Sequence, residues 1–77
     1  MTYQQKFEEL RNDFAEASDK YLKVDKALSE INGFGDISLI SDFANAKRDF
    51  EITGNNYHNF LAIAQKNDAK PNDEFGQ

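Results

Sequence analysis

The sequence predicts an all-α fold in which two long amphipathic helices, about 3–32 and 37–66, form an antiparallel hairpin. Two apolar stripes support this prediction, together with the short glycine-containing segment between them. Within each stripe, large apolar residues recur at alternating intervals of four and three positions. This period puts every member on one side of a helix, whereas a strand needs a period of two.

The first stripe runs through four heptads without interruption. Its members are Tyr3, Phe7, Leu10, Phe14, Ala17, Tyr21, Val24, Leu28 and Ile31. Thr2 and Gln5 match a capping box at the start of this helix, because each side chain can satisfy a free backbone N–H of the other residue. Asn32 and Gly33 suit a left-handed cap at its end.

The second stripe has the same spacing. Its members are Leu39, Phe43, Ala46, Phe50, Thr53, Tyr57, Phe60 and Ala64. Asp36 or Ser38 is the expected N-cap. The poor helix formers at 53–56 would divide this segment into two helices if they broke it. However, the apolar phase passes through them without a slip, which favours one continuous helix. We interpret Gly54 as a weak surface position rather than as a site of close helix approach or a hinge.

Two registers would align the stripes in a hairpin. In the preferred register Tyr21 faces Ala46, so that a large side chain opposes a small one. The turn is then centred between Gly33 and Phe34, close to the expected caps. A register shifted by one heptad would centre the turn at Ile37 instead.

A single two-helix hairpin cannot bury all the surface of its aromatic residues. Each aromatic side chain can bury about 150–250 Å², and further apolar residues lie beside the stripes. These are Leu22, Ile40, Ile52, Leu61 and Ile63. A wide apolar arc is typical of bundle helices. We therefore expect the hairpin to form a homodimer, which makes a four-helix bundle, or to receive helices from a partner.

Length and composition limit the other features. The 77 residues allow one small domain, 1–66, followed by a polar tail, 67–77, that we expect to be disordered. There is no cysteine for a disulfide, so oligomerisation is the remaining supplement to a small core. No apolar run is long enough to cross a bilayer, and the N-terminus does not resemble a signal peptide. We expect a cytoplasmic protein without membrane contact.

No grouping of side chains indicates catalysis. His58, the single histidine, falls off the stripe and is interpreted as an exposed surface residue. No Glu-x-x-His motif occurs and no carboxylate lies on a stripe, which argues against a two-metal bundle site. Gly33, Gly35 and Gly54 do not form a phosphate loop. We expect no enzyme activity, no cofactor and no metal.

Acidic residues gather in the first half of the first helix. They are Glu8, Glu9, Asp13, Glu16 and Asp19. Lys20 and Lys23 follow at spacings that favour ion pairs with Glu16 and Asp19, so a solvated face is the ordinary interpretation and a docking patch the functional one. The net charge of −5 argues against direct contact with nucleic acid.

These observations favour a non-enzymatic interaction module that self-associates and binds or inhibits another protein, such as a host-factor inhibitor from a phage or mobile element. One alternative is an adaptor or chaperone that accepts a partner helix. The other is an acidic nucleic-acid mimic or accessory factor that docks on a nucleic-acid-binding protein. The candidate partner-binding residues are Glu9, Asp13, Glu16, Asp19, Leu22, Ile40, Ile52, Leu61 and Ile63.

Overall fold

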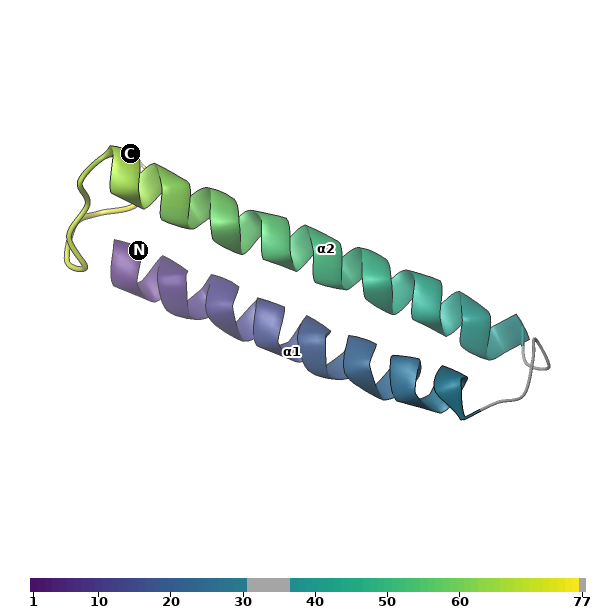
Figure 1. Cartoon of the computed structure of the whole chain (residues 1–77). Helices are drawn as coiled ribbons and strands as arrows, with labels where there is room; N and C mark the ends of the chain where they lie inside the picture. The colour runs from purple at the N-terminus through teal and green to yellow at the C-terminus, as the bar shows by residue number, and fades with distance from the viewer. Residues whose placement is uncertain (31–36, 77) are drawn as a thin grey trace.

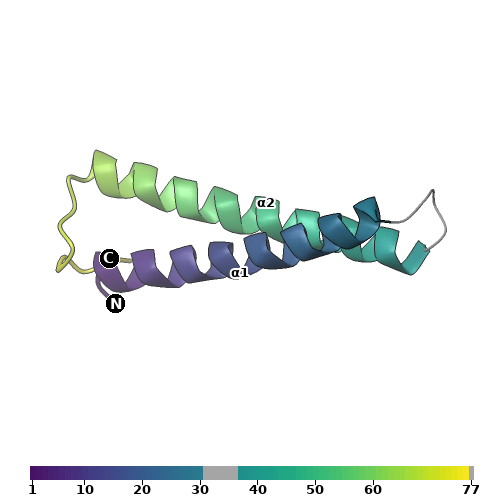
Figure 2. The ribbon, with the colours of Figure 1, turned by 60° about the horizontal axis from the view of Figure 1, so that its bottom comes forward.

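The computed structural model describes residues 1–30 and 37–76, which form two helices. Helices α1 (Tyr3–Ser29) and α2 (Ile37–Lys66) run antiparallel, side by side (Figure 1). They cross at a small angle, which the rotated view makes visible (Figure 2). The molecule is a rod of 51 × 16 × 15 Å. The predicted two-helix hairpin is confirmed, and its dimerisation stays a prediction. Neither helix is long and apolar enough to cross a membrane within the described part of the chain.

The capping box at the start of α1 is confirmed. Gln5 N–H donates to Thr2 Oγ1 over 3.2 Å, and Thr2 N–H donates to Gln5 Oε1 over 2.8 Å. At its other end α1 stops at Ser29, earlier than the predicted 32. The Ser29 hydroxyl donates to the Lys26 carbonyl over 2.8 Å and so competes for an acceptor of the last turn.

The remaining cap predictions are decided only in part. The predicted cap at Asn32 and Gly33, and the N-cap at Asp36, lie outside the described residues. Ser38 is inside α2, which already begins at Ile37, so it is not the N-cap.

Helix α2 is continuous through its weak segment, as the unbroken apolar phase predicts. The Thr53 hydroxyl donates to the carbonyls of Asp49 and Phe50 over 2.8 and 3.2 Å, so it is satisfied inside the helix. Gly54 is buried, and a Cβ there would lie 3.1 Å from Phe14 Cε1. The interpretation of Gly54 as a weak surface position is therefore wrong, because its missing side chain makes room for the Phe14 ring.

Aromatic rings from the two helices alternate along one side of the seam and form a continuous series, which we call the aromatic ladder. Its rings are, in spatial order, Phe7, Tyr57, Phe14, Phe50, Tyr21 and Phe43, with neighbouring centroids 5.0–5.9 Å apart. Tyr21 contacts both Phe43 and Phe50, which flank Ala46 by about one turn each. Tyr21 thus lies over Ala46, which is 2% exposed. These contacts match the preferred register.

The segment 67–76 folds back over the open end of the hairpin (Figure 1). Tyr3 N–H donates to Asp73 O over 2.9 Å, and Gln4 N–H donates to Pro71 O over 3.0 Å. These N–H groups belong to the first turn of α1 and have no acceptor inside the helix. The Phe75 ring meets Tyr3 edge-on, with centroids 5.1 Å apart. This arrangement differs from the disordered tail that composition predicts. Composition cannot predict individual hydrogen bonds or ring contacts with a distant part of the chain.

Candidate interaction surfaces

The seam has an aromatic side and a small-residue side. The rings of the ladder all occupy one of the two stripe positions in the heptad, while the other position holds mainly smaller residues such as Ala17, Ala46 and Thr53. In an antiparallel pair, equivalent heptad positions of both helices lie on the same side. We call the side toward which the rings lie the ladder face and the opposite side the alanine face.

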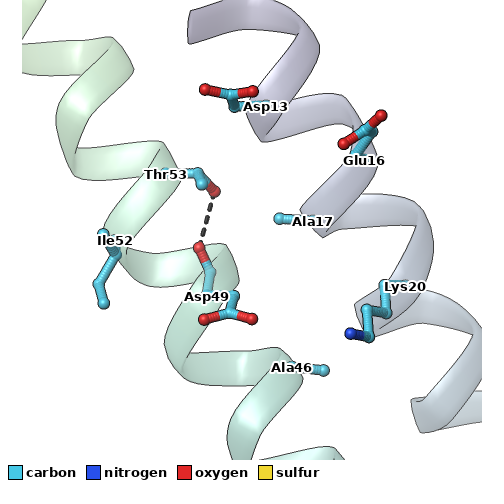
Figure 3. A pocket seen from close by; sticks show the side chains of 8 residues that line it. All are labelled: Asp13, Glu16, Ala17, Lys20, Ala46, Asp49, Ile52 and Thr53. Carbon is cyan, nitrogen blue, oxygen red and sulfur yellow. Dashed lines mark hydrogen bonds between the residues drawn. The ribbon is translucent and has the colours of Figure 1, made fainter.

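A hollow of about 330 Å³ marks the alanine face (Figure 3). Ala17 and Ala46 lie between the two helices and are too short to fill it. The other residues that line it are Asp13, Glu16, Lys20, Asp49, Ile52 and Thr53. Three carboxylates against one ammonium group make the hollow acidic. The structure therefore brings together three of the predicted candidates, Asp13, Glu16 and Ile52.

The other acidic candidates lie elsewhere. Glu9 accepts from Lys6 Nζ over 3.2 Å, which partly neutralises it. Asp19 is exposed and does not line the hollow. Within residues 1–30 and 37–76, no ion pair joins Lys20 or Lys23 to the acidic residue one turn before it. Glu9 and Asp19 therefore lie outside the acidic hollow of the alanine face.

The apolar candidates divide between the two faces. Ile52, which is 50% exposed, and Ile63 flank the alanine side of the seam. Leu22 is 61% exposed and, by heptad position, belongs to the ladder face. Ile40 is half-buried on the same face, and Leu61 lines a hollow beside Phe7 there. The candidates therefore form two surfaces rather than one.

The ladder face leaves the outer edges of its rings uncovered, since all six rings are only half-buried. A second hollow lies between the Phe14 and Phe50 rings, Gly54 and His58. His58 is exposed, as predicted, and its ring centroid lies 5.8 Å from that of Tyr57 and 6.4 Å from that of Phe14. The histidine therefore extends the row of rings.

Sequence reasoning missed part of the ladder face. Ile37 is 80% exposed at the first residue of α2, and the small residues Ala15, Ser18 and Ala44 follow ladder rings by one or four positions. Such positions lie on the same flank as the ring they follow. That spacing is the signal in the sequence that would have found them.

The arrangement suits contact with another surface. The hollows are shallow and open, and no group of three acidic, histidine or cysteine side chains in the described ranges is placed to hold a metal ion. Comparison with protein-family models, with curated proteins and with solved structures finds no match to this chain.

Proposed function

We propose that this chain is a non-catalytic interaction module: a helical hairpin that self-associates and binds another protein, whose surface it blocks. The observation that supports this proposal is the incomplete core. Among the described residues, the buried apolar side chains are Ala17, Ala46 and Phe60, while every ring of the ladder keeps an exposed edge. Burying the remaining aromatic surface would stabilise an assembly by about 25 cal/mol per Å².

The dimensions of the rod support the same proposal. Its radius of gyration is 16.5 Å, against about 11.5 Å for a compact domain of this length. Its accessible surface is 5846 Å², whereas a compact monomer of the same mass exposes about 4,800 Å². The excess of about 1,000 Å² is close to the roughly 800 Å² that each partner buries in a standard interface.

Two separate faces permit self-association and partner binding at the same time. The alanine face combines Asp13, Glu16 and Asp49 with exposed Ile52. A partner that presents basic and apolar side chains would complement it. Lys20 among these carboxylates weakens the case for a nucleic-acid mimic, which needs an unbroken row of negative charge.

Light scattering after size-exclusion chromatography, from micromolar to millimolar protein, tests self-association. We expect a mass of two chains or more at the higher concentrations. A monomer throughout that range would contradict the proposal, because the ladder would then stay uncovered.

A pull-down from the source cell tests partner binding, with Ile52→Asp as the matched variant. This substitution lies away from the ladder face, so it should leave the dimer intact and remove the captured partner. Capture that is equal for both proteins would place partner binding elsewhere.

A further inference from the structure

The ladder face has the composition of an interface core. Five of its flanking positions carry charge, on the residues Glu8, Arg11, Asp25, Lys47 and Glu51. The equivalent flank of the alanine face has ten charged positions. They are Lys6, Glu9, Asp13, Glu16, Lys20, Lys23, Glu30, Asp42, Asp49 and Lys66. Stable interfaces are depleted of charge at their centre and enriched in aromatic residues. The ladder face, rather than the alanine face, is therefore suited to form the centre of an interface between two copies of the chain.

We propose that a second copy of this chain covers the ladder face, related by a two-fold axis at the level of Ser18 and Asp49, with the two turns at opposite ends of the bundle. This inference rests on the self-association proposed above and names the surface and geometry that bring it about. Ser18 and Asp49 lie at the same height in the hairpin, in the register that places Tyr21 over Ala46. An axis at that height meets the middle of the rod.

Charge complementarity supports this axis. Arg11 and Asp25 lie seven residues on either side of Ser18, so the two-fold places Arg11 of each copy beside Asp25 of the other. Lys47 and Glu51 lie two residues on either side of Asp49. The two-fold therefore also places Lys47 of each copy beside Glu51 of the other. In the described part of the chain, these four side chains form no ion pair within their own copy.

Side-chain size is complementary about the same axis. Leu22, 61% exposed in the hairpin, comes level with position 14 of the second copy and so beside Ala15, the small residue that follows it. Ala44 comes opposite Gly54, where the absent side chain leaves the Phe14 ring accessible. Leu22 therefore meets a small residue, and Ala44 and Gly54 are both small enough to let the two copies approach closely.

The other two-fold arrangement, with both turns at the same end, lacks this complementarity. It stacks α1 of each copy on α2 of the other at equal heights. Lys47 would then face the neighbourhood of Leu22, and Arg11 would approach His58. Neither contact neutralises a charge, so opposite turns are favoured.

Disulfide trapping tests the axis directly, because the chain has no native cysteine. Ser18→Cys places a thiol at the axis, and mild oxidation of the folded protein should convert most of it to a covalent dimer. Asn12→Cys, on the outer side of α1, is the matched control and should stay largely uncrosslinked.

Charge exchange tests the same interface without a cross-link. Lys47→Glu should raise the dissociation constant of the dimer roughly tenfold. It places a second carboxylate beside Glu51 of the other copy, and this repulsion occurs twice per dimer. The double variant K47E/E51K restores opposite charges and should return the dissociation constant to within about threefold of the original. Arg48→Glu, on the outer side of α2, should change it little.

The outcomes separate this inference from the proposed function. A dimer by light scattering in which S18C does not cross-link and K47E has no effect would overturn the ladder-face axis and leave self-association standing. A monomer at all concentrations would overturn both. Cross-linking of S18C together with rescue by K47E/E51K would support both.

Discussion

Phe14 of α1 packs closely against Gly54 of α2, where an added Cβ would lie only 3.1 Å from Phe14 Cε1. The Phe14 ring stacks on Phe50 at 5.3 Å and on Tyr57 at 5.8 Å, and it reaches the α2 backbone at Gly54 between them. A glycine inside a helix costs about 1 kcal/mol relative to alanine. Here that cost is offset by the approach of a large ring, so the residue is part of the seam.

Gly54→Val should lower the free energy of unfolding by about 2 kcal/mol, because the branched side chain displaces the Phe14 ring. Urea titration followed by circular dichroism measures this change. Valine is a better helix former than glycine, so helix propensity alone predicts that the substitution raises the free energy of unfolding. Asn55→Val, at the exposed neighbouring position, is the control and should stay within about 0.5 kcal/mol. Unchanged or increased stability of G54V would contradict the proposed role of Gly54.

At the scale of elements, the segment 67–76 acts as a cap for α1. It supplies carbonyl acceptors to the first turn and lays the Phe75 ring against Tyr3 and Phe60, at 5.1 and 5.3 Å. Glu74 also accepts from the amino group of Met1 over 2.6 Å. The open end of the hairpin is thereby closed by the chain itself, whereas the ladder along its side is not.

Phe75→Ala should loosen this cap. The side chain is half-buried, so we expect a loss of about 1–2 kcal/mol, below the 3–5 kcal/mol of a fully buried phenylalanine. Hydrogen exchange at the amides of Tyr3 and Gln4 should accelerate, because their acceptors lie in the released segment. Asn72→Ala, an exposed change in the same segment, should leave exchange as it is. Equal exchange in all three proteins would show that the segment does not cap α1.

At the scale of the whole molecule, the rod has a large surface for its mass and a small buried core. A chain of this size has little stability to spare, so association and folding should be linked. Such linkage gives the proposed dimer a thermal signature that a stable monomer lacks.

The melting temperature should rise with protein concentration, by about 3–6 °C for each tenfold increase. Calorimetry or circular dichroism over a hundredfold range of concentration measures this slope. The oxidised S18C dimer is the control, because its two chains cannot separate and its melting temperature should not depend on concentration. A melting temperature that stays constant for the uncrosslinked protein would contradict linked association.

The sequence predicted the hairpin well because its evidence is local. The spacing of the stripe fixes which side of each helix is apolar, and Thr2 with Gln5 fixes the start of α1. The sequence placed Leu22 and Ile52 beside the stripes, and in the structure these side chains are 61% and 50% exposed. The candidates were not divided into two faces, although their heptad positions separate them once the helices are known to pack antiparallel.

By itself, then, the sequence determined two helices, their apolar sides and the continuity of α2, since periodicity and capping act within one helix. Only the tertiary structure decided the role of Gly54 and the fold of the segment 67–76. A glycine becomes a contact site only when a particular ring arrives from the other helix, and a polar segment becomes ordered only when free N–H groups and an aromatic pair lie within its reach. Both depend on contacts between residues that are far apart in the chain. The register of the hairpin decides which of these residues come into contact.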